Sequence, residues 1–451
     1  MSSDKFRRQL REEVEQWHSE GLIDSSLYDK LCHRYQFSEL ERFTRNRFVR
    51  ILLLLGSILL CLGILTFIAA NWQIWSRELK VGFFLIIFLS LNTVGFFLWR
   101  YPKQGLRNLL GEGLLMLGGL TLGANMLLMS QLFLQNKPIY QFYLAWGLGV
   151  LAMAYSLQMK SLGILSILLT ALGYLLGQIQ PDFLILGEFP VLRLMVQHMP
   201  LLAGFMFIPL AYKCRSQWIF RLGLLSIIYS FEANLLRLNL LIPQPWLAAI
   251  ASSLPPAMLW GYSDSLWGKY LPKVKLFDRT SRTLAILFLI CLFFLLSFYG
   301  IWHLSFVPVA NDISVLHWHL LLDIMILGGF TIWEWLRLLR RWDFNSSLIA
   351  GAIAISAIVP YIHLSTGNFA ITAIVIFNLL LFLLALGLIR EGLKQVQRRL
   401  FWGGIVLLTL QIFSRMLEYT NDLMFISVVL FLCGLAGISS GLWFERYLQR
   451  R

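Results

Sequence analysis

The sequence predicts an all-α fold: a polytopic integral membrane helix bundle of about 14 transmembrane helices, with a short N-terminal cytosolic helical segment. Three observations predict it. Of the 451 residues, 58% are hydrophobic and 14% are charged, whereas soluble globular proteins carry about 25% charged residues. Apolar runs of about 20 residues recur, and a helix of that length crosses about 30 Å of hydrocarbon. Aromatic residues, including 16 Trp, make up 14% of the chain, which is typical of membrane interfaces.

The segment before the first apolar run is predicted to form a helical hairpin. Residues 4–19 read as one helix, which Gly21 ends. Asp24 or Ser25 caps a second helix through Tyr35, because a short side-chain oxygen accepts from free N–H groups at a helix start. The hairpin is therefore expected to fold in the cytosol.

A third, basic helix is expected after Ser38, and it brings four arginines to the membrane surface: Arg42, Arg45, Arg47 and Arg50. These arginines indicate either a lipid-sensing segment or a plain topogenic anchor. The expected organisation has three parts, namely the cytosolic segment and two membrane helix groups: residues 1–50, 51–245 and 246–451.

The apolar runs give fourteen expected spans: 51–70, 81–98, 109–132, 140–157, 161–179, 199–212, 222–241, 246–262, 283–302, 317–336, 347–364, 369–389, 401–418 and 423–444. The sixth is short and the eighth contains Pro255-Pro256, so the alternative is twelve spans. With the N-terminus in the cytoplasm, the fourteen-span topology places 32 of the 38 Lys and Arg residues inside and 5 outside. The positive-inside rule therefore predicts an inner-membrane protein with both termini cytoplasmic.

Three spans carry polar side chains that are candidates for function. Glu112 shares a helical stripe with Gly119 and Gly123, so it is expected to face a neighbouring helix, as a cation or proton ligand or as a plain packing residue. Glu232 is the deepest carboxylate and has no basic partner at its depth, so it is expected to bind a proton or reach water. The alternative for Glu232 is a structural hydrogen-bonding role.

The tenth span carries His319, Asp323 and Glu334 on one narrow stripe with Arg337. Arg415 lies in the outer half of the thirteenth span, which runs in the opposite direction. The similar depths predict an Asp323–Arg415 ion pair, either lining a polar cavity or purely structural. No catalytic, cofactor-binding or metal-binding residue is expected, because phosphate-loop, dinucleotide, nucleophile-elbow and zinc motifs are missing and the five cysteines are scattered.

The segments EQWHSEGLIDSSLYDKLCHRY, GILTFIAANWQ and GLTLGANMLLMSQLF resemble the predicted bacterial membrane proteins of domain of unknown function 2157. The resemblance covers about residues 10–160. It implies a short cytosolic helical pair followed by a membrane array, and it implies no activity or catalytic residue.

The sequence leaves three functions open. The first is a transporter or a flippase-like protein, which the many spans and the intramembrane polar residues favour. The second is a non-catalytic membrane scaffold or an assembly or stress factor, whose N-terminal helices bind a cytosolic protein partner. The third, an enzyme acting on lipid, is favoured least. Membrane lipid is the expected partner and nucleic acid is not, since the basic excess follows from cytoplasmic loops. The two halves of seven spans have no prolines at matching places, so an internal repeat has weak support.

Overall fold

The structure, a computed structural model, describes residues 10, 13–14, 16–18, 20–35, 56, 59, 66, 76–101, 105–133, 138–179, 190–241, 244–264, 277–302, 318–340, 344–367, 369–419 and 423–449. Every regular element in these ranges is a helix, as the sequence predicts. The chain divides into two compact units, residues 1–83 and 84–451.

The first unit contains helix α2 (Ser25–Tyr35), which has the predicted bounds. The Asp24 carboxylate accepts the Ser25 N–H at 2.8 Å, and Gly21 has a left-handed φ of 73° that ends the preceding turn. Val14 is fully buried in a small apolar cluster with Leu10, Ile23, Tyr28, Leu31 and Cys32. The basic helix expected after Ser38 and nearly all of the first expected span lie outside the described residues.

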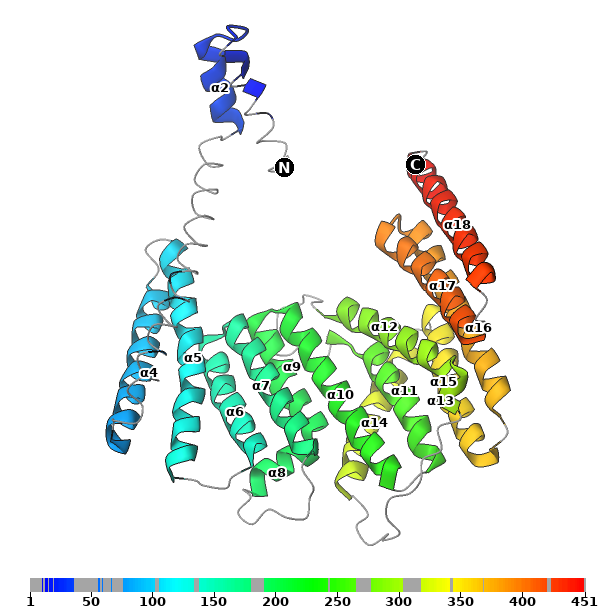
Figure 1. Cartoon of the computed structure of the whole chain (residues 1–451), viewed down its shortest axis with the longest axis horizontal. Coiled ribbons are helices and arrows are strands. Elements are labelled where there is room, and N and C mark those ends of the chain that lie inside the picture. The colour runs from blue at the N-terminus through cyan, green and yellow to red at the C-terminus, as the bar shows by residue number, and fades with distance from the viewer. Residues whose placement is uncertain are drawn as a thin grey trace. The chain divides into compact units, whose positions relative to one another are not determined.

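Helix α4 (Arg77–Arg100) contains the division between the units. The helices that follow it are shown in Figure 1: α5 (Gly105–Phe133), α6 (Ile139–Leu157), α7 (Lys160–Ile179), α8 (Pro190–Gln197), α9 (Met199–Cys214), α10 (Gln217–Leu241), α11 (Pro245–Gly261), α12 (Asp278–Leu296), α13 (Tyr299–Trp302), α14 (Trp318–Leu339), α15 (Phe344–Thr366), α16 (Ala370–Lys394), α17 (Arg398–Tyr419) and α18 (Leu423–Gln449).

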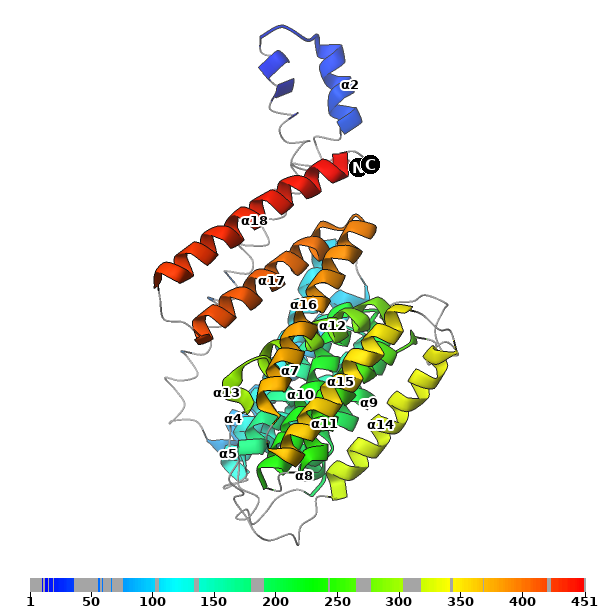
Figure 2. The same ribbon diagram turned by 90° about the vertical axis from the view of Figure 1, so that its right-hand side faces the viewer.

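Three apolar clusters lie in the described part of the second unit, and the two larger ones form its main cores. In the first, α6 packs on α7, α7 on α10 and α10 on α9 (Figure 1). The fully buried side chains of this core include Leu144, Leu162 and Phe207. In the second, α12, α15 and α16 pack together (Figure 2). The ring centroids of Phe293 and Phe377 in this core are 5.8 Å apart. Because lipid tails are as apolar as these side chains, close van der Waals packing between the helices stabilises each core.

Within the described residues, nine helices are long and apolar enough to cross a membrane: α4, α5, α7, α10, α12, α15, α16, α17 and α18. The pair α8 and α9, bent by 91°, forms a tenth if it is counted as one broken span. Helices α6, α11 and α14 coincide with three further expected spans but fall outside this set. Helix α11 has only 17 residues, and α14 carries three charged side chains that lower its mean hydropathy.

Candidate functional site

Two proline-containing helices, α11 and α15, cross in antiparallel directions in the second unit. Trp260, near the end of α11, donates through Nε1 to the Ser346 hydroxyl near the start of α15, at 3.3 Å. Proline has no N–H, so it leaves the carbonyl four residues earlier without its usual helical donor. Pro256 therefore frees the Ser252 carbonyl of α11, and Pro360 frees the Ser356 carbonyl of α15.

The two freed carbonyls are bonded reciprocally across the crossing. The Ser252 hydroxyl donates to the Ser356 carbonyl oxygen at 2.6 Å, and the Ser356 hydroxyl donates to the Ser252 carbonyl oxygen at 3.2 Å. Each helix thus satisfies the backbone defect that proline makes in the other, which is the condition under which proline is tolerated inside an apolar bundle. The sequence signal is the same Ser-x-x-x-Pro spacing in both helices, and the sequence analysis missed it.

Removing these hydroxyls should weaken the crossing. We expect Ser252→Ala and Ser356→Ala each to lower the free energy of unfolding by about 1–2 kcal/mol, because each leaves a buried carbonyl without a donor. Thermal unfolding of the purified protein in detergent measures the loss. Ser253→Ala is the matched control, because the Ser253 hydroxyl bonds only the Ala249 carbonyl of its own helix. A control as unstable as either variant would contradict the role assigned to the crossing.

A cavity of about 390 Å³ lies beside this crossing. It is lined by residues of α10, α11, α12 and α15: Glu232, Leu235, Leu236, Leu247, Ala248, Ala251, Ser252, Phe288, Cys291, Leu292, Leu295, Leu296 and Pro360. This volume falls in the range of ligand pockets, about 300–1,000 Å³. Glu232 is the single ionisable carboxylate among these otherwise mostly apolar residues.

Glu232 has no partner within the described part of the chain. Its Oε1 atom is buried and makes no hydrogen bond. Arg237, five residues along α10, turns instead to α7, where its Nη1 donates to Gln178 Oε1 at 3.4 Å. The sequence expectation that Glu232 lacks a basic partner therefore agrees with the geometry, and the structure adds the cavity that the side chain lines.

A second polar cluster holds the break between α8 and α9. His198 lies at the 91° bend, and its Nδ1 is 2.6 Å from Oδ1 of Asp323 on α14. Asp323 is fully buried, and its other oxygen, Oδ2, makes no hydrogen bond. The break is also held from α10, where Asn234 Nδ2 donates to the Gln197 carbonyl at 3.1 Å. The pair therefore connects a broken helix to α14.

Asn234 belongs to a network that extends to α7. Its Oδ1 accepts from the Tyr174 hydroxyl at 2.7 Å and from Gln178 Nε2 at 2.8 Å. The Tyr174 hydroxyl also donates to the Ser230 carbonyl at 2.9 Å. Helices α7, α8 and α10 are thus joined by polar contacts at the same end.

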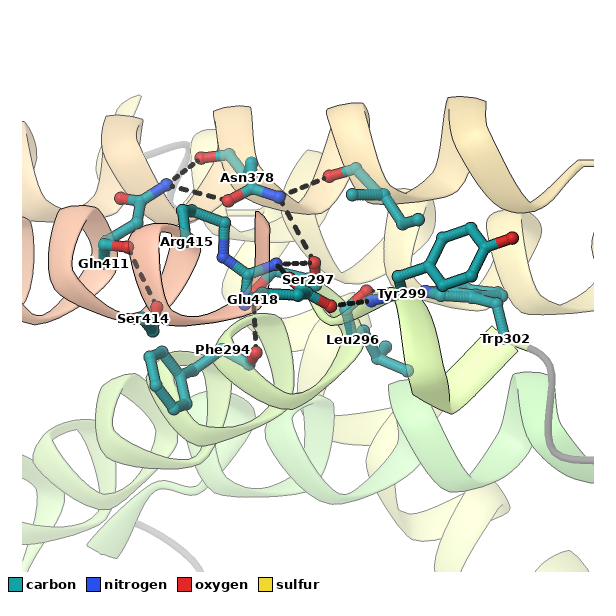
Figure 3. Close-up of polar contacts among 11 residues, drawn as sticks. Phe294, Leu296, Ser297, Tyr299, Trp302, Asn378, Gln411, Ser414, Arg415 and Glu418 are labelled. Atoms are coloured by element: carbon teal, nitrogen blue, oxygen red, sulfur yellow. Dashed lines mark hydrogen bonds and ion pairs between the residues drawn. The ribbon is translucent and has the colours of Figure 1, made fainter. Parts of the chain in front are cut away.

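A third cluster holds the break between α12 and α13 (Figure 3). Arg415 of α17 donates through Nη1 to the Ser297 carbonyl and to Glu418 Oε2. Glu418 Oε1 accepts the backbone N–H of Tyr299 at 2.6 Å. One ion pair thus bonds a carbonyl that ends α12 and an amide that begins α13. The Arg415 guanidinium also lies over the Phe298 ring, 4.1 Å from its centroid.

Amide side chains continue this cluster onto α16, as Figure 3 shows. Asn378 Nδ2 donates to the Ser297 carbonyl at 3.4 Å and to the Ile374 carbonyl at 2.9 Å. Gln411 Nε2 donates to the Asn378 carbonyl at 2.8 Å. Atoms Nε and Nη2 of Arg415 are buried without a hydrogen bond among the described residues.

The predicted Asp323–Arg415 ion pair is wrong. Asp323 bonds His198 and Arg415 bonds Glu418, so each has a partner that the sequence analysis did not assign. Depth along a helix predicted the pair, but the direction in which each side chain points decided the partners. His198 directly precedes a helix that carries Pro200 in its first turn, and Glu418 lies one turn after Arg415, so both signals were in the sequence.

The other candidate residues have different surroundings. Glu334 is buried on the same face of α14 as Asp323, with Arg337 Nη1 at 3.7 Å. The side chain of His319 lies outside the described residues. Glu112 is exposed, so the described residues do not cover its side chain. At Gly119, helix α5 does approach helix α6 closely, since the Gly119 carbonyl accepts from Trp146 Nε1 at 2.8 Å.

The sequence analysis also missed a set of hydrogen bonds around Asp264, just after the C-terminal end of α11. The Asp264 carboxylate accepts the N–H groups of Phe277 and Asp278 at 2.9 and 3.2 Å, and it also accepts the Tyr212 hydroxyl of α9. The Asp264 N–H donates to Asp278 Oδ1 at 2.7 Å. These bonds join the end of α11 to the start of α12.

Within the described residues, no group of His, Cys, Asp and Glu could hold a metal ion.

Residues 15–163 match the family model described as "Predicted membrane protein (DUF2157)". This match confirms the resemblance expected over about residues 10–160. It covers about a third of the chain and ends before α8, so the cavity and both helix breaks lie outside it. No curated protein and no solved structure matches the chain. With nine apolar helices in the described part, the match identifies a predicted membrane protein.

Proposed function

We propose that the chain is a transporter-like or flippase-like protein that carries an amphiphilic molecule through the cavity at Glu232. The observation that carries this proposal is the position of that cavity beside the crossing of α11 and α15. In secondary transporters, substrate sites lie near the bilayer midplane among helices that contain Pro or Gly. A lone carboxylate inside such an apolar site is a functional group by default.

The proposal includes the fourteen-span topology in the cell (inner) membrane, with both termini cytoplasmic. Glu232 lies nine residues before the end of α10, which is about 14 Å at 1.5 Å per residue. In this topology the cavity and the two helix breaks belong to the outer half of the bilayer. The concentration of Lys and Arg in the cytoplasmic segments supports this orientation.

The two helix breaks, which lie in the outer half of the bilayer in this topology, support movement of the broken helices there. Irregular backbone is tolerated at membrane depth only where protein or a water-filled cavity satisfies it. Here side chains bond backbone groups at both breaks: Asn234 bonds the Gln197 carbonyl at the first, and at the second Arg415 bonds the Ser297 carbonyl and Glu418 bonds the Tyr299 amide. A broken helix held by side chains can change its angle without losing a continuous ladder of helical hydrogen bonds.

Transport can be tested with purified protein reconstituted into vesicles. Fluorescent probes with one or two hydrocarbon chains are placed in both leaflets, and a membrane-impermeant quencher reports how fast the inner probes reach the outer leaflet. We expect the wild-type chain to accelerate at least one single-chain probe over protein-free vesicles. Glu232→Gln and the cavity-filling Ala251→Phe should both slow that probe, since both alter the cavity lining.

The matched control is Glu112→Gln, which makes the same chemical change at an exposed position on α5. It should leave the rate unchanged. Wild-type rates equal to protein-free rates for every probe would overturn the proposed function, and so would equal rates for wild type and both cavity variants.

A second candidate function is a membrane scaffold that binds a cytosolic protein through the N-terminal helices. The observation that favours it is the exposure of three large apolar side chains on this small unit: Trp17, Leu22 and Leu27. Exposed apolar groups can mark protein contacts when they form a patch. Vesicles in which the folded chain moves no probe would favour this second function.

A further inference from the structure

We propose that the cavity at Glu232 binds a single-chain cationic amphiphile, of which a long-chain primary amine is the simplest member. The ammonium group lies on the Glu232 carboxylate, and the hydrocarbon chain lies along the apolar wall. This inference rests on the proposed function insofar as the bound amphiphile is the transported substrate. The binding site itself can be tested without transport.

The wall of the cavity fits a hydrocarbon chain. Six leucines from three helices supply most of the apolar lining: Leu235, Leu236, Leu247, Leu292, Leu295 and Leu296. For an occupant that comes from the bilayer, these leucines stabilise the hydrocarbon chain by van der Waals packing. The cavity volume of about 390 Å³ lies at the lower end of the range for ligand pockets, which suits one chain.

The cavity is reached from the side of the bundle. Leu236 on α10 and Leu295 on α12 line it and are 54% and 55% exposed. Cys291 on α12 also lines it and is exposed. These helices are candidate membrane spans, so their exposed side chains face lipid tails. An occupant therefore enters laterally, as a molecule already dissolved in the bilayer.

The carboxylate selects the head group. A buried polar group without a hydrogen bond costs free energy, and Glu232 has no partner among the described residues. The other polar lining groups do not serve it, since the Ser252 hydroxyl already donates to backbone carbonyls and the Cys291 thiol is a weak donor. An ammonium group brings three donors and an opposite charge. A phosphate-bearing head would instead place like charges together.

The test measures binding of dodecylamine to the purified full-length chain in a non-ionic detergent, with dodecanol as the uncharged probe of equal chain length. We expect the amine to bind at least about tenfold more tightly than the alcohol. Glu232→Gln should remove this preference by lowering the affinity for the amine and leaving the affinity for the alcohol unchanged. Glu112→Gln should preserve the preference.

Cysteine protection locates the binding site in the same sample. The amine should slow maleimide labelling of Cys291, which lines the cavity, and leave labelling of Cys433 on α18 unchanged, as measured for each peptide by mass spectrometry. Equal affinities for amine and alcohol would overturn the proposal. So would a Glu232→Gln protein that keeps the preference, or protection of both cysteines alike.

The outcomes separate this inference from the proposed function. If the amine binds at Glu232 while reconstituted vesicles show no accelerated probe, the transport proposal fails and the binding site stands. If an uncharged or anionic probe is transported while the amine shows no preference, the head-group inference fails and transport stands.

Discussion

Replacement of His198 by leucine is expected to lower the free energy of unfolding by about 3–5 kcal/mol, because it leaves a fully buried carboxylate without its partner. Asp323 is 0% exposed, and its Oδ2 atom already makes no hydrogen bond. Among the described residues, the bond between His198 and Oδ1 is therefore the contact that satisfies this group. Thermal unfolding in detergent should show the loss as a lower melting temperature.

The double variant His198→Leu with Asp323→Leu is the decisive comparison. Replacing both partners of a buried pair by apolar groups is often nearly neutral, whereas removing one partner is costly. The double variant should therefore be more stable than His198→Leu alone. A double variant that unfolds as early as the single one would show that His198 acts through its position at the α8–α9 bend and not through Asp323.

The helices themselves were largely predictable from hydropathy. Each expected span that lies in the described part of the chain coincides with a helix, including the eighth with its Pro255-Pro256, except that the ninth is divided between α12 and α13. Helix α11 continues through both prolines because a residue of α15 supplies the missing donor to Ser252. The count of about 14 spans is not confirmed, since nine helices of the described part reach the length and hydropathy of a membrane span, or ten if the bent pair is counted as one.

The partners of the polar residues were not predictable by the same means. Depth in the bilayer follows from sequence position, but the rotation of each helix and the position of a break do not. Asp323 and Arg415 were expected to meet because their depths agree, yet each bonds near a different helix break. The two prolines with the same Ser-x-x-x-Pro spacing, Pro256 and Pro360, both lie in the second half of the chain. A search for prolines at equivalent positions of the two halves therefore does not find them.

Replacement of Arg415 by leucine is the second change with a large expected effect. It removes the donor to the Ser297 carbonyl and leaves Glu418 without its ion-pair partner, both at the α12–α13 break. We expect a loss of about 3 kcal/mol in the free energy of unfolding, at the lower end for buried pairs that lose one member, because both side chains are 16% exposed. Arg415→Lys should recover only part of it, because an ammonium cannot reproduce the fork of a guanidinium.

Arg398→Leu, in the same helix α17, is the control for this prediction. Arg398 at its other end pairs with Glu445 of α18 at 2.9 Å, but the two side chains are 65% and 46% exposed. An exposed ion pair contributes about 0–1 kcal/mol, so Arg398→Leu should change the melting temperature little. Hydrogen exchange localises the effect: Arg415→Leu should speed exchange of the Tyr299 amide, which bonds the Glu418 carboxylate. Equal losses for Arg415→Leu and Arg398→Leu, with the Tyr299 amide still protected, would show that the ion pair does not hold the break.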